Sequence, residues 1–410
     1  MDWSDSPDQA AFRAELRRFV AARLPQRYRE YDEDASEDRG AGIWLSDRKS
    51  AEPERQRAAR EWAQALASKG WVAPAWPREY GGAGLSIFEQ YIFKQEMAAT
   101  GAPPVGGVHA VEMLGPTLIL HGDEPQRTAH MPRILAGEES WAQGYSEPGA
   151  GSDLASLQTR AVRDGDDYIV NGQKIWTSAA HHADWLFALV RTDQAAPKHR
   201  GISFLMMDIH TPGITLRPIV DMGFEYHFNE TFFEDVRVPA HQRVGEENRG
   251  WYVGMTLLDL ERSGIIQTVG MRKAIERIVE HVRSEEGRAR TRFAALPQLR
   301  AELAERAIEV EVTGNFGLRI THMQNGGLVP NYESSVAKLF LSETQQRLAN
   351  TGMKAFGLHS TLWDAADPRA PLQAHFTKDY VRTVPTTIYS GTSEIQRNII
   401  ATRGLGLPRG

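Results

Sequence analysis

The glycine-rich stretch Gln143-Gly-Tyr-Ser-Glu-Pro-Gly-Ala-Gly-Ser-Asp153 marks the point at which the pattern of the sequence changes. Gly149 and Gly151 permit unusual backbone dihedrals, and the hydroxyls of Ser146 and Ser152 can donate hydrogen bonds. The stretch therefore predicts a loop whose backbone approaches a ligand closely. The same residues also fit a plain glycine-rich connection that only leads into the next domain.

The region from about residue 139 to about residue 245 consists of short segments that are rich in β-branched and aromatic residues. Several such strands at close spacing predict a small antiparallel β domain. At the end of one of them lies Trp176, whose indole fits either the face of a planar cofactor or the protein core. In the first case, Thr177 or Ser178 would bond the polar edge of that cofactor. The strand segments are YIVNGQKIWTS, ADWLFALVRT, GISFLMMDI and ITLRPIV.

Helical patterns flank this region on both sides. Ser6 and Gln9 form a capping box ahead of apolar residues at helical spacing, and Ser86 and Glu89 form a second one. Residues 26–56 are charged and turn-rich and predict an exposed excursion. After the β region, long helices of a bundle are expected near 250–284, 297–325 and 332–356.

The predicted fold class is therefore α+β, with three regions in the order α, β, α. We expect an N-terminal helical domain over residues 1–138, a β domain over 139–245 and a C-terminal four-helix-bundle domain over 246–410. A length of 410 residues agrees with two or three domains.

The composition excludes several classes of protein. There is no cysteine, which rules out disulfides, cysteine-ligated metal sites and thiolate nucleophiles, so redox chemistry requires a bound cofactor. The net charge of −6 gives no electrostatic footprint for nucleic acid. No apolar run is long enough to span a bilayer, and the N-terminus is acidic and polar. We expect a cytoplasmic protein without a nucleic-acid or membrane partner.

His181 and His182 are adjacent and predict no metal site, because neighbouring residues seldom aim at one ion.

Four blocks of the sequence carry a family resemblance. SEPGAGSD (146–153) followed by NGQKIWTS (171–178) resembles the flavin-binding signature of the acyl-CoA dehydrogenase family. The blocks 71–84, 229–251 and 387–408 resemble three further parts of that family in the same order, so the similarity covers nearly the whole chain. The resemblance implies that the chain binds FAD and oxidises an acyl-CoA thioester to the 2,3-enoyl-CoA. It also implies an electron-transfer flavoprotein or a similar electron acceptor.

The resemblance further implies which residues contact the cofactor. Ser152 would lie at the site and face the acyl-CoA, and the helix that begins near Ser393 would present its amides to a phosphate. The implied FAD contacts are Gln143, Tyr145 and Ser146 on one side of the isoalloxazine, Trp176 and Ser178 on the other, and Thr392 and Glu394 in the C-terminal block.

The reaction of the family requires a base. The α-proton beside a thioester is weakly acidic, so a desolvated carboxylate with a raised pKa is needed, together with donors for the enolate oxygen. Many family members carry the base directly before the Gly-Thr of the C-terminal block, where this chain has Ser390. Ser390 cannot act as a base, but its backbone N–H can still contribute to the oxyanion site.

A second position for the base occurs in members that act on branched or bulky acyl groups, in a segment like Leu-Glu-Arg. This chain has Leu258-Asp-Leu-Glu-Arg-Ser263, and we expect Glu261 to be the base, with Arg262 as a helper that contacts the substrate. Helical spacing places the apolar Leu257, Leu258 and Ile265 and the small Gly264 around Glu261, whereas Asp259 faces away. The alternative is that Glu261 forms a structural ion pair with a neighbouring arginine.

Two segments depart from the family pattern. Ala294 stands where the Arg-x-x-Phe-Gly segment has its glycine, and Lys354-Ala-Phe-Gly-Leu358 replaces Gln-x-x-Gly-Gly. In the family both segments serve the FAD of a neighbouring subunit. The expected assembly is therefore a homotetramer or a heterotetramer with a related chain. A non-catalytic structural subunit of such a heteromer is an alternative function, and a flavin oxidase or monooxygenase is a third.

Overall fold

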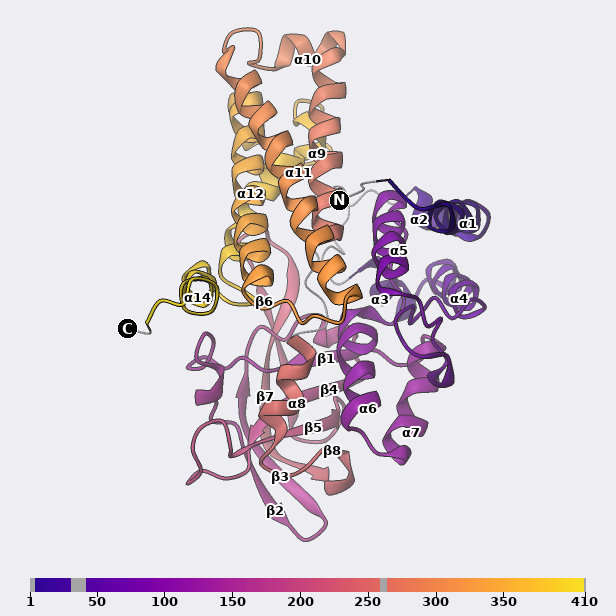
Figure 1. Cartoon of the computed structure of the whole chain (residues 1–410), viewed down its shortest axis with the longest axis vertical. Coiled ribbons are helices and arrows are strands. Elements are labelled where there is room, and N and C mark those ends of the chain that lie inside the picture. Colours follow the sequence, from indigo (N-terminus) through magenta and orange to yellow (C-terminus); the bar gives the residue numbers. More distant parts are fainter. Residues whose placement is uncertain (1–3, 31–41, 259–263, 409–410) are drawn as a thin grey trace.

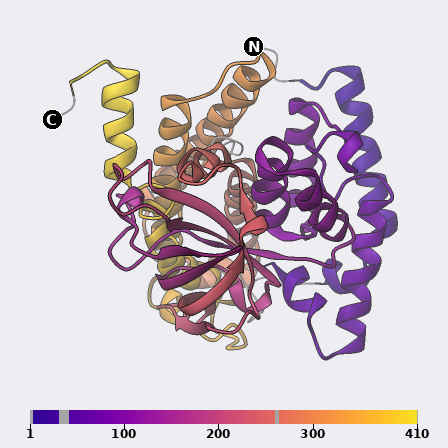
Figure 2. The same ribbon diagram turned by 90° about the horizontal axis from the view of Figure 1, so that it is seen from below.

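The computed structural model describes residues 4–30, 42–258 and 264–408. Glu261 and Arg262 therefore lie outside the described residues. Helices form the beginning and the end of the chain, and a sheet lies between them in sequence, as the patterns predict (Figure 1). A view from below shows the N-terminal helices on one side of the sheet region and the C-terminal helices on the other (Figure 2).

The N-terminal region is helical, and both predicted capping boxes are present. The Gln9 amide donates to the Ser6 hydroxyl over 3.3 Å, and the Ser86 amide donates to the Glu89 carboxylate over 2.7 Å. Each serine thus satisfies amides that a helix start leaves free. The helices are α1 (Pro7–Arg23), α2 (Gln26–Arg29), α3 (Ile43–Arg48), α4 (Pro53–Ala67), α5 (Ile87–Thr100), α6 (Gly115–His121) and α7 (Glu124–Leu135), with a π-helix at His109–Leu114.

The prediction of an exposed excursion over residues 26–56 is wrong at Tyr28 and over α3, which are buried, whereas Ala51–Glu54 are exposed. Helix α3 buries Trp44, and the indole N–H donates to the carbonyl of Ala59 on α4 over 2.9 Å. The many charges in the sequence around α3 hid this short apolar segment from the prediction.

A buried carboxylate fixes α5 against α1, because Glu96 pairs with Arg13 at 2.5 Å and with Arg17 at 2.7 Å.

The central sheet has the strand order β6-β7-β3-β2-β4-β5-β8, and β1 pairs with β4 outside this path. The domain is largely antiparallel as predicted, but β1 runs parallel to β4, and β2 also meets β4 in a parallel bridge. The long β7 joins β3 and β6 and was not among the predicted strands. The strands are β1 (Trp141–Gly144), β2 (Arg160–Asp164), β3 (Asp167–Lys174), β4 (Trp185–Arg191), β5 (Ile202–Asp208), β6 (Ile214–Val220), β7 (Tyr226–Pro239) and β8 (Arg243–Val244).

Long helices follow the sheet and form an elongated bundle at one end of the molecule (Figure 1). The predicted helix over 250–284 is not continuous, because Gly264 takes a left-handed φ of 61° directly before α9. No helix in the described part of the chain is long and apolar enough to cross a membrane. The helices are α8 (Gly250–Leu258), α9 (Ile265–Arg283), α10 (Glu285–Arg290), α11 (Gln298–Asn325), α12 (Tyr332–Phe356), α13 (His375–Arg382) and α14 (Ser393–Ile399).

Candidate active site

The end of β1 presents two buried polar atoms without a protein partner. The Gln143 amide nitrogen and the Tyr145 hydroxyl lie near each other, yet neither makes a hydrogen bond of ordinary geometry to any described residue. Burial raises the pKa of the Tyr145 phenol well above its usual value, so the hydroxyl keeps its proton. Because buried polar atoms are nearly always satisfied, these two indicate a place where a polar ligand edge binds.

The segment after β3 lies beside this position. The Ile175 amide donates to the Ser146 carbonyl over 2.9 Å, which joins the two predicted flavin-contacting segments. Trp176 has a left-handed φ of 60° and is 55% exposed. An aromatic residue in this conformation is strained, and such strain concentrates at functional sites. The exposed indole face is therefore available to a planar group, and Ser178 is half-buried next to it.

Asparagine 229 of β7 holds this strained segment in place. Its backbone exchanges hydrogen bonds of 3.0 and 3.2 Å with Thr177, and its buried side-chain amide donates to the Thr177 carbonyl over 3.0 Å. The Tyr226 hydroxyl donates to the Asn229 side-chain oxygen over 2.6 Å. The rigid sheet thus supports the Trp176 conformation. Asn229 lies in the block 229–251, for which the sequence predicted no residue role.

The tip of the glycine-rich loop is open. Gly149 and Gly151 do not use the left-handed dihedrals that glycine permits, since neither has a positive φ. A Cβ atom added at either position would meet no protein atom within 4 Å. Ser152 is exposed at the same tip, and Asp153 pairs with Lys198 at 2.8 Å. No contact within the described chain therefore requires glycine here, and the tip is open to its surroundings.

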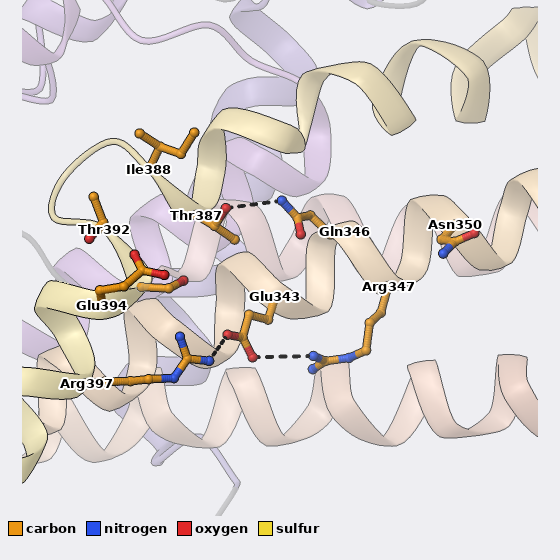
Figure 3. Close-up of a pocket in the computed structure, with 10 residues that line it drawn as sticks. Glu343, Gln346, Arg347, Asn350, Thr387, Ile388, Thr392, Glu394 and Arg397 are labelled. Atoms are coloured by element: carbon orange, nitrogen blue, oxygen red, sulfur yellow. Dashed lines mark hydrogen bonds and ion pairs between the residues drawn. The ribbon is translucent and has the colours of Figure 1, made fainter.

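The C-terminal block forms a second group at the start of α14. Thr392 is the N-cap, and its hydroxyl accepts the Ile395 amide over 3.2 Å, so one of the amides expected for a phosphate is already occupied. Thr392, Ser393 and Glu394 line a pocket of about 550 Å³ together with side chains of α12 (Figure 3). The Ser393 hydroxyl is buried there and has no hydrogen-bond partner among the described residues.

Opposite charges alternate along the floor of this pocket. Glu343 of α12 pairs with Arg397 of α14 and, at 3.7 Å, with Arg347 (Figure 3). Glu394 is exposed, and hydrogen bonds to its own amide and to Thr392 lower the pKa of its carboxyl, which keeps it ionised. Because the two arginines are balanced by two carboxylates, the pocket suits a polar uncharged chain better than a free anion.

Two side chains fix the turn that carries Ser390 by binding its carbonyl groups. Ser390 and Gly391 have left-handed φ values of 53° and 87°. The Lys338 ammonium donates to the Gly391 carbonyl over 2.7 Å, and the Gln396 amide donates to the Ser390 carbonyl over 3.1 Å. Both carbonyls therefore point toward these side chains. No described residue accepts a hydrogen bond from the Ser390 amide, which stays available as a donor.

Glu261 and Arg262 lie outside the described residues, but the helix before them is placed. Helix α8 passes directly over the end of β1, because a Cβ atom at Gly254 would lie 2.9 Å from the Tyr145 hydroxyl. Helix α8 ends at Leu258, four residues after Gly254. Gly254 is a contact that the sequence reading missed, although a glycine inside an apolar helix signals a close approach.

Two histidines that the sequence reading also missed lie near these elements. Burial lowers the pKa of His109 to about 4, and the charge of His227 acts in the same direction. Burial and the nearby His181 lower the pKa of His227 to about 4. His109 belongs to the π-helix, and its ring packs against Phe187 at 6.5 Å, while Phe187 in turn packs against Tyr145 at 5.9 Å. Both imidazoles are neutral near pH 7.

The low pKa values of His109 and His227 predict that the protein loses stability in mild acid. The folded pKa of about 4 lies below the unfolded value of 6.5, so the unfolded chain binds more protons as the pH falls through this window. We expect the free energy of unfolding to have its full value above about pH 6.5. It should then fall by roughly 2–3 kcal/mol per histidine as the pH is lowered toward about 4. His109→Gln should flatten this dependence in urea titrations. An equally steep slope in that variant would contradict the prediction.

Comparison with known proteins bears on this arrangement. Three family models match in order: the acyl-CoA dehydrogenase N-terminal domain over residues 6–138, the middle domain over 142–236 and the C-terminal domain over 248–405. The chain belongs to the acyl-CoA dehydrogenase family. It is accordingly an enzyme of the acyl-CoA dehydrogenase type, and its α, β, α order is the fold of that family.

Individual relatives of this acyl-CoA dehydrogenase resemble it over most of their length. The acyl-CoA dehydrogenase IpdE1 of Mycobacterium tuberculosis is 38% identical over 353 residues, which cover 85% of this chain and 88% of that protein. A solved structure described as the Tcur3481-Tcur3483 steroid ACAD is 32% identical, with a TM-score of 0.84 and all of both chains covered. The ChsE4-ChsE5 complex from Mycobacterium tuberculosis is 33% identical, with a TM-score of 0.80 and all of both chains covered.

The two departing segments have roles inside the chain. Phe293 is buried in the bundle core, and the Arg292 amide donates to the Ala355 carbonyl over 2.8 Å. Lys354 pairs with Glu302 at 2.9 Å, whereas Leu358 is 88% exposed. Neither segment therefore presents the glycine backbone that the family pattern leads one to expect at Ala294 and Leu358.

Proposed function

We propose that this chain is an FAD-dependent acyl-CoA dehydrogenase that converts a branched or bulky acyl-CoA thioester to the 2,3-enoyl-CoA. The observation that carries the proposal is the complete overlap with solved steroid acyl-CoA dehydrogenases, with a TM-score of 0.84 over all of both chains. A ring-bearing acyl group fits this likeness. The cradle formed by Tyr145, Gln143 and Trp176 supports FAD as the cofactor, since its free polar atoms and exposed indole match a planar ring with a polar edge.

The residues have separate roles in this proposal. Gln143, Tyr145, Ser146, Trp176 and Ser178 hold the isoalloxazine of FAD, which supplies the hydride acceptor. Thr392 and Glu394 contact the polar chain of the cofactor in the pocket beside α12. Ser152, at the exposed loop tip, contacts the CoA thioester.

Catalysis requires a base and an oxyanion donor. Glu261 removes the α-proton, and Arg262 contacts the substrate beside it. The Ser390 amide donates to the thioester oxygen as negative charge develops there, and this donor is fixed because Lys338 and Gln396 bind the carbonyls of its turn. Serine at position 390 leaves the space of a second carboxylate free, which suits a bulky acyl group.

The assembly that we propose is a heterotetramer with a related chain. The complex named ChsE4-ChsE5 supports it, and so do Ala294 and Leu358, which leave the chain without the glycines that serve a neighbouring subunit's FAD. An electron-transfer flavoprotein or a similar protein would accept the electrons. A structural subunit without catalysis is the second candidate, favoured by the same departures.

Anaerobic mixing of the purified chain with FAD and a panel of straight, branched and ring-bearing acyl-CoAs tests the proposal. We expect the visible flavin absorbance to bleach with the branched or ring-bearing members, and mass spectrometry to find a product that has lost two hydrogens. A colourless, inactive homomer that gains activity with a related chain would support the structural-subunit alternative instead, provided that Glu261→Gln leaves the activity of that heteromer intact.

A further inference from the structure

Lysine 174 is completely buried at the end of β3. Its ammonium donates to the Glu147 carboxylate over 2.8 Å and to the Tyr145 carbonyl over 3.1 Å. A lysine is rarely buried fully unless it is paired. The Tyr145 carbonyl belongs to the residue whose hydroxyl lacks a partner, so the buried cation bears directly on the cradle at the end of β1.

Glu147 connects this cation to the far end of the loop. It is 8% exposed, and its carboxylate accepts the amide of Gln158 over 2.6 Å and the amide of Thr159 over 2.9 Å. Its backbone exchanges two hydrogen bonds of 3.0 Å with Ala150, which closes the turn around Pro148. One carboxylate therefore joins the beginning of the loop, its end and the Lys174 cation.

A third buried charge, the guanidinium of Arg191, binds the segment that follows the loop. The Arg191 guanidinium on β4 donates to the carbonyl of Ala155 over 2.6 Å and to that of Leu157 over 3.3 Å. Between these anchors the tip is not packed, because added Cβ atoms at Gly149 and Gly151 would touch nothing. A pocket of about 490 Å³, lined in part by Glu147 and Gln158, lies against the same turn. The position of the tip thus depends on polar contacts at its base.

We propose that Glu147 and Lys174 are positioning residues, which set the distance between the loop Tyr145–Asp153 and the Trp176 segment for the cofactor. This role rests on the proposed function, because it presumes that FAD binds between these segments. Lys174 lies two residues before Trp176, while it grips the Tyr145 carbonyl across the site. A single buried pair therefore couples the two sides of the cradle.

The charges agree with this geometry. Burial lowers the pKa of Lys174 to about 8, although the Glu147 charge opposes the shift. Burial alone would raise the pKa of Glu147, but the Lys174 charge and the hydrogen bonds to Glu147 outweigh it and hold this pKa below its usual value. The pair is thus mutually dependent, and removal of one partner leaves the other as an uncompensated buried charge.

The test compares two buried glutamates. In Glu147→Gln one acceptor oxygen becomes a donor, so at least one of the Gln158, Thr159 and Lys174 donors loses its acceptor. We expect fluorescence titration with FAD to show about tenfold weaker binding and a changed flavin spectrum. Glu96→Gln, in the Arg13 and Arg17 pair far from the loop in the chain, is the matched control. It should lower the melting temperature without a change in the Kd for FAD.

A double variant separates positioning from stability. Glu147→Leu combined with Lys174→Met removes both charges, so no uncompensated buried charge remains and we expect the protein to fold, although the amides of Gln158 and Thr159 lose their acceptor. The Tyr145 carbonyl still loses its donor, and we expect the Kd for FAD to stay about tenfold weaker than in the wild type. Wild-type affinity in Glu147→Gln and in the double variant overturns the positioning role. A wild-type chain that takes up no FAD even when it is assembled with a related chain overturns the proposed function instead.

Discussion

Replacement of Glu261 by glutamine is expected to lower turnover by about a thousandfold while FAD binding and the fold are kept. Glutamine has nearly the same shape as glutamate but cannot accept the α-proton. The described structure leads to this position, since α8 runs over the Tyr145 hydroxyl at Gly254 and ends at Leu258. Gly264, with its left-handed φ, then starts α9. The base is thus proposed for position 261, which lies in the sequence between α8 and α9 and outside the described residues.

The measurement should isolate the base from the rest of the reaction. Exchange of the α-proton of an acyl-CoA with deuterated water needs a base and an oxyanion donor, and we expect it to be lost in Glu261→Gln together with flavin bleaching. Asp259→Asn is the matched control, because this carboxylate of the same segment is expected to face away. Near wild-type exchange in Glu261→Gln would remove Glu261 from the mechanism. Equal losses in both variants would point to a general charge effect.

The elements that the sequence predicted well are those with a local signal. The capping boxes predicted where α1 and α5 begin, because such starts depend on side chains three positions apart. Helical periodicity predicted the bounds of α11 and α12 almost to the residue. The two short motifs around Tyr145 and Trp176 also predicted segments that the structure joins through the Ser146 carbonyl. The roles of these residues toward FAD remain a prediction.

Contacts between residues far apart in the chain explain most of the features that the sequence did not predict. Strand β7 carries Glu230, Glu234 and Asp235 among its apolar residues, so its alternation is hidden, yet it holds Trp176 through Asn229. The parallel pairing of β1 with β4 depends on segments far apart in the chain, which a local pattern cannot reveal. The same holds for the low pKa values of His109 and His227, which depend on burial that only the packed domains create.

Lys174 was predictable in principle. Alternation along β3 places it on the same face as Tyr168 and Val170, which are both buried. A lysine on a buried face is credible only when a partner is known, and Glu147 lies in a loop whose path the sequence does not specify. The surroundings of Gly149 and Gly151 in that loop could not be predicted for a related reason. Their open surroundings, and not their dihedrals, set them apart, and only three-dimensional contacts reveal this difference.

The second large effect is expected in cofactor content. Purified without a related chain, this protein should retain clearly less than one FAD per chain, and its affinity should rise at least about tenfold when the family pattern is restored. The restoring variant combines Ala294→Gly, Lys354→Gln and Leu358→Gly. Leu358 is 88% exposed, so its removal costs the chain little packing, whereas the Lys354 pair with Glu302 is lost.

Native mass spectrometry and flavin absorbance of the homomer measure this content directly. Leu328→Gly is the matched control, because this leucine is 60% exposed in the connection between α11 and α12 and lies outside the restored segments. It should leave FAD content unchanged, while the restoring variant gains FAD in the assembled oligomer and not in a monomer. One FAD per chain in the unmodified homomer would contradict the heterotetramer. Because Leu358 and Ala294 stand where the family pattern serves a neighbouring subunit's FAD, a gain confined to the oligomer would assign the defect to the site between subunits.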